Sequence, residues 1–168
     1  MYIYKDYKTY EDKLSFTSQP MCITVVPCTD KAVVTLPCEG SIQFINTTNN
    51  TKDNKIEIGE ECFGVTAVKD NIYIGGGSKV LILNTDGSRV REITTGGGYN
   101  SNLLYNERND QLLLRQLDIL CCINLDGHVI YRYDISGLRG MAVDQQGHVY
   151  ISVDDSKTYK GCHQMQHS

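Results

Sequence analysis

Apolar and polar residues alternate in short runs along most of this chain, and similar runs recur at a nearly constant distance. Four segments open the repeat: Cys22–Val26, Gly64–Val68, Asn102–Asn106 and Gly140–Asp144. Aligned on their second residues, these segments lie 42, 38 and 38 residues apart. The repeat region shows no sustained 3.6-residue apolar period, which would indicate helices. The pattern therefore predicts short strands in a repeated order.

Further strand-like runs follow each opening segment. The second runs are Ala32–Leu36, Asn71–Gly75, Gln111–Arg115 and His148–Val153. The third runs are Ile42–Asn46, Val80–Asn84 and Leu120–Asn124. The fourth runs are Lys55–Ile58, Val90–Ile93 and Val129–Tyr133. After two of the third runs, the Asp-Gly pairs ending at Gly87 and Gly127 supply the positive φ of a tight hairpin.

Four short antiparallel strands in about 40 residues are typical of a β-propeller blade. The continuous apolar runs Val80–Leu83 and Leu112–Leu114 suit strands buried on both faces by neighbouring sheets. We therefore expect an all-β chain that forms an incomplete β-propeller of about three and a half four-stranded antiparallel blades. The expected blades are 21–58, 62–94, 101–135 and an incomplete 138–153. A β-sandwich is the alternative, but it would not explain the ordered repeat.

The two ends of the chain lie outside the repeat. In residues 1–20, Ile3, Tyr7, Tyr10 and Leu14 have helical spacing, which predicts a short helix; an irregular lead-in with a strand near 14–17 is the alternative. The polar tail 154–168 lacks alternation and is expected to be disordered. Because propellers close with four to eight blades, we expect a fragment of a longer protein, whose open blades could self-associate.

Charge and cysteine content limit the classes of function that the sequence supports. A net charge of −4 and a pI near 5.5 argue against a surface built for phosphates or anionic membranes. The sequence has no apolar run of about 20 residues and no secretory signal, which predicts a cytoplasmic location. The seven cysteines include no CxxC pair and are expected to be reduced core thiols. We expect no metal and no cofactor.

The segment Gly140–Ser152 resembles an NHL repeat: a Gly-apolar-Ala-Val-Asp opening, a polar turn with Gly147, and an aromatic second strand. Gly64–Ile74 repeats this pattern, and residues 21–152 resemble the C-terminal propellers of tripartite-motif proteins, especially the molluscan set. In that family a RING finger, B-boxes and a coiled coil precede the propeller. The resemblance implies a ubiquitin ligase whose propeller recruits a protein or RNA. Because this sequence lacks the Cys/His ladders of RING and B-box modules, we expect no enzymatic activity from it.

Three other functions have weaker support in the sequence. The run Gly75–Lys79 leads into a strand and lacks the Gly-Lys-Ser/Thr order of a phosphate-binding loop. A propeller hydrolase with a channel metal is disfavoured, since the inner-strand positions hold one carboxylate in four: Thr24, Thr66, Tyr105 and Asp144. RNA binding is possible, but the arginines are spread over both ends of the blades and the chain is acidic.

One end of the predicted propeller gathers the loops from fourth to first strands and from second to third strands. Aromatic and charged residues in these loops form the predicted binding set: Phe63, Lys79, Tyr99, Arg115, Asp118 and Arg139. Aromatic and arginine side chains are enriched at the energetic centres of protein interfaces. The sequence thus predicts a non-catalytic module that binds a protein partner or ubiquitination substrate.

Overall fold

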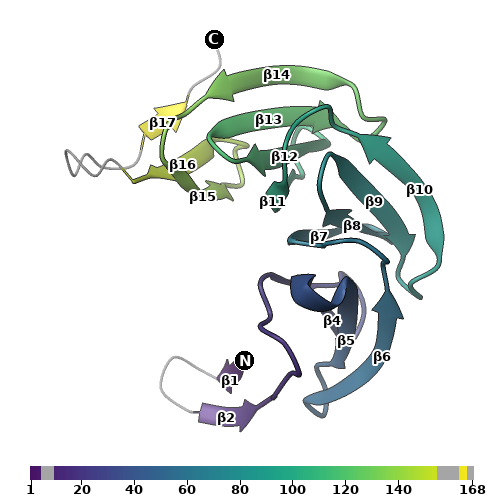
Figure 1. Cartoon of the computed structure of the whole chain (residues 1–168). Helices are drawn as coiled ribbons and strands as arrows, with labels where there is room; N and C mark the ends of the chain where they lie inside the picture. The colour runs from purple at the N-terminus through teal and green to yellow at the C-terminus, as the bar shows by residue number, and fades with distance from the viewer. Residues whose placement is uncertain (5–9, 155–162, 166–168) are drawn as a thin grey trace.

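Four antiparallel sheets, the blades, follow one another along the chain and form an open arc (Figure 1). The computed structural model describes residues 1–4, 10–154 and 163–165. The first blade contains β3 (Ile23–Val25), β4 (Lys31–Leu36), β5 (Ser41–Asn46) and β6 (Thr51–Glu57), with a 3₁₀ turn at Pro37–Glu39. The second contains β7 (Gly64–Val68), β8 (Asn71–Gly75), β9 (Lys79–Asn84) and β10 (Arg89–Thr94). The third contains β11 (Asn100–Asn106), β12 (Gln111–Gln116), β13 (Ile119–Asn124) and β14 (Val129–Asp134). The fourth contains β15 (Leu138–Val143), β16 (Val149–Val153) and β17 (His163–Met165).

Each strand pairs with the next strand in sequence, so the order within a blade is first, second, third, fourth. The first strands lie on the inner side of the arc, and β6, β10 and β14 form its outer side (Figure 1). Gly87 and Gly127 close the third-to-fourth hairpins with φ of 91° and 96°. This architecture confirms the predicted all-β, incomplete propeller.

Apolar cores lie between successive blades. One core joins Ile42 and Phe44 of the first blade to Ile72 and Ile74 of the second. The adjacent residues Cys121 and Cys122 of β13 belong to different cores, facing the second and fourth blades respectively. Neighbouring strand residues point to opposite faces, so a strand buried on both sides needs a continuous apolar run.

Both chain ends differ from expectation. Where we expected a short helix or an irregular lead-in, β1 (Tyr2–Tyr4) and β2 (Tyr10–Lys13) form an antiparallel hairpin. Ile3 and Leu14 do share an apolar core, but they reach it from this hairpin and not from one helix face. In the tail expected to be disordered, β17 pairs with β16 through backbone contacts that do not require side-chain alternation. Tyr7 and residues 155–162 and 166–168 lie outside the described residues.

The cysteines that the structure describes range from exposed to buried, and Cys22 is intermediate. Cys28 and Cys38 are exposed, whereas Cys62, Cys121 and Cys122 are buried, and none of these forms a disulfide. Burial raises the pKa of all three buried thiols, that of Cys122 to about 11.

We therefore expect iodoacetamide at mildly alkaline pH to label Cys28 and Cys38 before Cys62, Cys121 and Cys122, because the thiolate is the reactive form and must be accessible. Peptide mapping by mass spectrometry measures the order. Early modification of Cys121 or Cys122 in the folded protein would contradict the buried cores.

Candidate partner-binding surface

A buried polar network supports the loops at the predicted binding end. Asn100 is fully buried at the start of β11, and its side-chain nitrogen donates to the carbonyls of Gly77 (3.0 Å) and Lys79 (2.9 Å). Its side-chain oxygen accepts from Gln116 Nε2 at 2.9 Å. Asn100 thus joins the loop after β8, the start of β11 and the end of β12. Because the side chains of Asn100 and Gln116 are buried, the bonds that they make hold the loops in fixed positions.

The aromatic pair of the predicted set is in contact above this network. The rings of Phe63 and Tyr99 meet edge to face, with centroids 5.3 Å apart at 81°. The Phe63 N–H donates to the Gly75 carbonyl at 2.7 Å, which fixes the start of β7 against β8. Phe63 is half-buried and Tyr99 is 51% exposed. The pair therefore presents an aromatic surface at the junction of the second and third blades.

Leu117, absent from the predicted set, is a further exposed apolar residue at this end of the blades. It lies in the tight turn between β12 and β13, is 64% exposed, and has a φ of 57°. A Cβ on Gly98 would lie 3.7 Å from Leu117 Cδ1, so the leucine packs beside the segment that carries Tyr99. In the sequence, the only indication for Leu117 was its position in a turn between two apolar runs. Nothing in the sequence showed that the apolar side chain would point into solvent.

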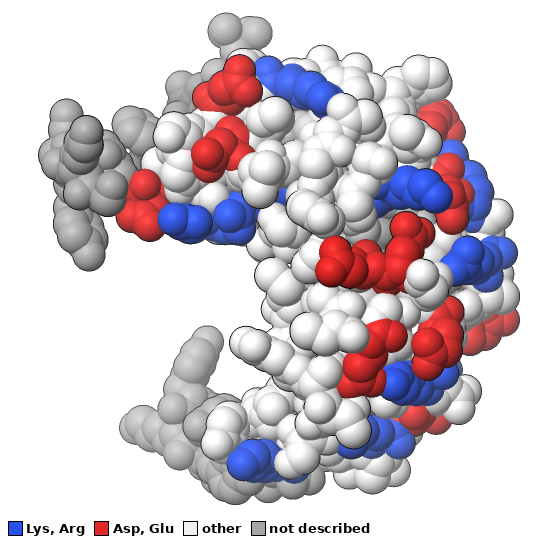
Figure 2. All heavy atoms as spheres, in the orientation of Figure 1, with Lys and Arg blue, Asp and Glu red and all other residues white. Residues whose placement is uncertain are grey.

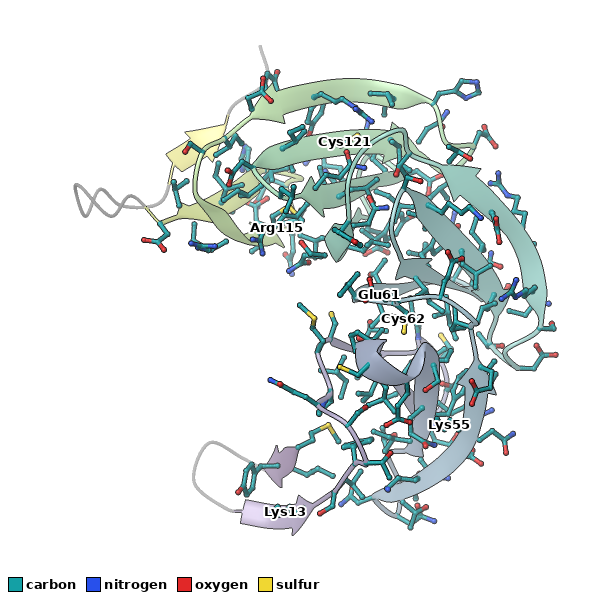
Figure 3. The ribbon with its side chains drawn as sticks, viewed as in Figure 1. Lys13, Lys55, Glu61, Cys62, Arg115 and Cys121 are labelled. Atoms are coloured by element: carbon teal, nitrogen blue, oxygen red, sulfur yellow. The ribbon has the colours of Figure 1, made fainter. Side chains whose placement is uncertain are left out.

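The predicted arginines are also brought together. Arg115 Nη1 donates to the Arg139 carbonyl at 3.0 Å, and the Arg139 guanidinium pairs with Asp154 at 2.9 Å. Figure 3 shows Arg115 on the inner side of the arc near β15. Asp118 accepts from the Gly137 N–H at 3.0 Å and so ties the β12–β13 turn to the loop before β15. These residues join the third and fourth blades at the same end.

Lys79 stands apart from this group. Its ammonium pairs with Glu92 of the neighbouring strand β10 at 3.1 Å, and this contact raises the pKa of Lys79. The pair is partly exposed, so its contribution to stability is small. The structure therefore brings Phe63 next to Tyr99, and it brings Arg115, Arg139 and Asp118 together. Lys79 instead pairs with the outer strand of its own blade.

Charges on the face in view are mixed. Figure 2 shows Lys and Arg side chains interspersed with Asp and Glu along the arc. Among the described residues, no group of three or more His, Cys, Asp or Glu side chains is placed to hold a metal ion. The described part of the chain contains no helix long and apolar enough to cross a membrane.

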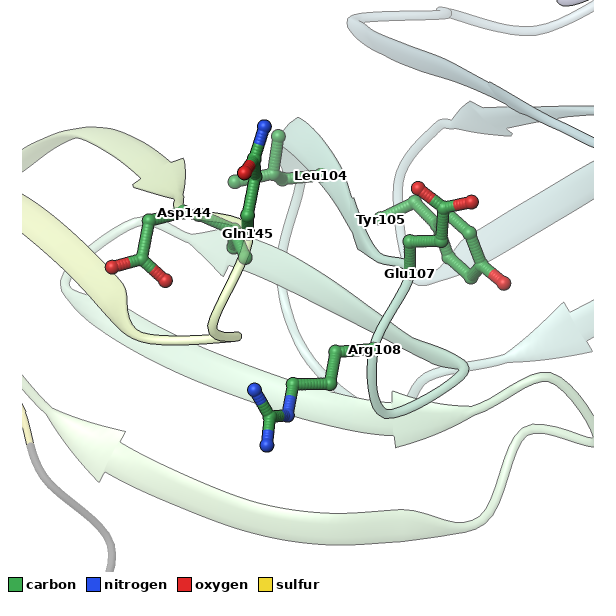
Figure 4. Close-up of a pocket in the computed structure, with 7 residues that line it drawn as sticks. Leu104, Tyr105, Glu107, Arg108, Asp144 and Gln145 are labelled. Atoms are coloured by element: carbon green, nitrogen blue, oxygen red, sulfur yellow. The ribbon is translucent and has the colours of Figure 1, made fainter.

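Two hollows lie at the opposite end of the blades, beside the turns between first and second strands. The hollow of about 470 Å³ in Figure 4 includes Tyr105, Glu107, Arg108 and Asp144. Burial would raise the pKa of Asp144, but hydrogen bonds from His148 and Tyr150 outweigh it and lower that pKa to about 2. This carboxylate is therefore committed to its own turn and is a poor proton acceptor near neutral pH.

The second hollow, of about 640 Å³, shares Tyr105 and Glu107 with the first and adds Lys69 and Asp110. Burial and a 2.5 Å hydrogen bond to Asp110 raise the pKa of Tyr105 to about 12. The tyrosine therefore stays protonated and structural at neutral pH. These hollows do not include any residue of the predicted binding set.

Comparison with known proteins supports the architecture. Hydrazine synthase of Kuenenia stuttgartiensis superposes with a TM-score of 0.70 at 14% identity, over 90% of this chain and 49% of that one. A streptogramin B lyase structure superposes with a TM-score of 0.69 at 15% identity, over 90% and 56%. The chain has a β-propeller fold.

This propeller chain spans about half the length of the two matched chains. At such low identity the likeness concerns the fold alone. No protein-family model matches the chain, and no curated protein sequence matches it.

Proposed function

We propose that this propeller chain is a non-catalytic protein-interaction module. Its partner binds the surface formed by Phe63, Tyr99 and Leu117, with Arg115 and Arg139 beside it. Exposed aromatic and apolar side chains supply contact area, and the adjacent guanidinium groups add directional contacts. The NHL resemblance extends this proposal to the recruiting propeller of a tripartite-motif-like ubiquitin ligase, with a ubiquitination substrate as the bound protein.

The backbone of Leu117 carries the proposal. A residue with a Cβ costs about 1–2 kcal/mol in the left-handed region, and a leucine there is an outlier. The side chain is mostly exposed, so burial in this chain offsets little of that cost. Strained residues cluster at functional sites because a role outside folding retains them. An exposed leucine beside Tyr99 is well suited to insert into a partner.

Leu117→Asn separates a binding role from a folding role. Asparagine tolerates positive φ, so we expect the free energy of unfolding to rise by about 0.5–1 kcal/mol. Loss of the apolar side chain should reduce partner capture about fivefold or more, the effect of an interface residue worth over 1 kcal/mol. Denaturant unfolding measures the first effect, and quantitative mass spectrometry of proteins captured by the immobilised chain measures the second.

Val90→Asn is the matched control, because Val90 is 49% exposed on the outer strand β10. This variant should retain partner capture. A less stable Leu117→Asn variant, or one that captures the same proteins as the parent chain, would contradict the proposed surface.

A further inference from the structure

A recurring hydrogen bond relates the N-terminal hairpin to the blades. In three blades, the residue after the fourth strand donates its N–H to the carbonyl of the residue before the third strand. The pairs, donor first, are Ile58 and Gly40, Thr95 and Ser78, and Ile135 and Asp118, at 2.8, 2.8 and 2.6 Å. Leu14, directly after β2, donates in the same way to Met1, directly before β1, at 3.1 Å. The hairpin β1–β2 therefore ends in the same way as these third and fourth strands, although Asp154 and Gly137 form the same bond across β16 and β15.

Packing gives the same assignment. Ile3 is the second residue of β1, as Ile42, Val80 and Leu120 are of β5, β9 and β13, and each of these three side chains belongs to the core shared with the following blade. Ile3 packs with Ala32, Val34 and Ile45 of the first blade. The hairpin thus covers the first blade as the outer half of a preceding blade would.

The inner half of that preceding position is not filled by any described strand, since β1 and β2 form a two-stranded sheet. Its absence leaves apolar residues of β3 uncovered. Ile23 and Val25 pair with Val34 and Ala32 on the same face of the sheet, yet they are 51% and 63% exposed. In the next two blades, Val65 and Leu103, the equivalents of Ile23, are only 2% and 4% exposed.

The fourth blade presents the complementary half. Its strands β15 and β16 are the first and second strands of the blade. The paired residues Ala142 and Tyr150 lie on the face directed away from the third blade. Ala142 is exposed. The equivalent pair in the second blade is Thr66 and Tyr73, both buried, and Tyr73 packs into the core shared with the third blade.

We propose that β15–β16 of a second copy dock on Ile23 and Val25, so that copies join head to tail. The inner half-blade of one copy then completes the outer half-blade β1–β2 of the other. Such a heterologous contact leaves a donor end and an acceptor end available for further copies or for ring closure. In the second copy the three-residue strand β17 lies beside β16 at the third-strand position, so β1 of the copy that supplies Ile23 and Val25 takes its place.

Single lysine substitutions at exposed positions test the contact on the full chain without disturbing its core. Ile23→Lys blocks the acceptor end, and Ala142→Lys blocks the donor end. Val129→Lys is the matched control, since Val129 is 49% exposed on the outer strand β14. Sedimentation velocity and light scattering across the micromolar range give the mass of each protein.

We expect the parent chain and the Val129→Lys control to assemble to at least twice the 18.9 kDa chain mass. Each blocked variant alone should remain monomeric. An equal mixture of the two should form a dimer and nothing larger, because one intact donor end then meets one intact acceptor end. A parent chain that stays monomeric, assembly by either blocked variant, or a mixture that stays monomeric would overturn the proposal.

Discussion

Replacing Gly75 by alanine is expected to lower the free energy of unfolding by about 3 kcal/mol or more, at the upper end for overpacked cores. A Cβ at this position would lie 2.4 Å from the Asn100 carbonyl oxygen and 2.4 Å from Leu103 Cδ1. Both atoms belong to the next blade, and the first is backbone, so the added carbon can be accommodated only by moving two sheets apart. Denaturant or thermal unfolding measures the loss.

Gly77→Ala serves as the control for this substitution. It lies in the same glycine run, and a Cβ there would meet nothing within 4 Å. We expect its stability to stay within about 0.5 kcal/mol of the parent chain. If Gly75→Ala were equally neutral, the close contact between the second and third blades would be refuted.

The second large effect is expected at Asn100. Asn100→Ala removes the donor to the Gly77 and Lys79 carbonyls and the acceptor for Gln116. A buried polar group left without its partner costs about 1–3 kcal/mol, which applies to Gln116, and the two partly buried carbonyls each lose a donor as well. We expect a loss of about 3 kcal/mol in the free energy of unfolding, measured by denaturant titration.

Asn109→Ala provides the comparison, because Asn109 is exposed in the turn between β11 and β12. Its stability should match that of the parent chain. An Asn100→Ala variant as stable as the Asn109→Ala variant would mean that the network does not hold the binding-end loops. Amide hydrogen exchange in residues 76–79 and 95–99 should also increase in the Asn100 variant, since these loops lose their shared anchor.

The strand order of the repeat was predictable because the strands depend on local pattern. Continuous apolar runs such as Val80–Leu83 can be satisfied only between two sheets, and the Asp-Gly pairs at Gly87 and Gly127 fit only a tight hairpin. Strand alternation likewise accounts for the burial of the adjacent residues Cys121 and Cys122 on opposite faces. Periodicity failed at the N-terminus, where Ile3 and Leu14 share a core through a hairpin although their spacing suited a helix.

The binding surface depended on contacts between distant segments. The aromatic residues Phe63 and Tyr99 were predictable as loop residues at one end, because strand order determines which loops share an end. Arg115 and Arg139 were predicted in the same loops, but they lie in the strands, near the end of β12 and the start of β15. Lys79 was predicted with them, yet its cross-strand partner Glu92 holds it at the outer edge. Leu117 was missed, since neither its positive φ nor its exposure is a property of local composition.

The amino-acid sequence alone determined that the chain is a repeat of four-stranded sheets, because hydrophobic periodicity and turn chemistry act within a few residues. Only the tertiary structure decided which glycines leave no room for a Cβ, which asparagine links the second and third blades, and which apolar residues stay exposed. These properties arise from the approach of one blade to the next. Residues such as Ile23 and Val65 have the same place in the repeat, but the sheet packed beside each one determines whether it is buried.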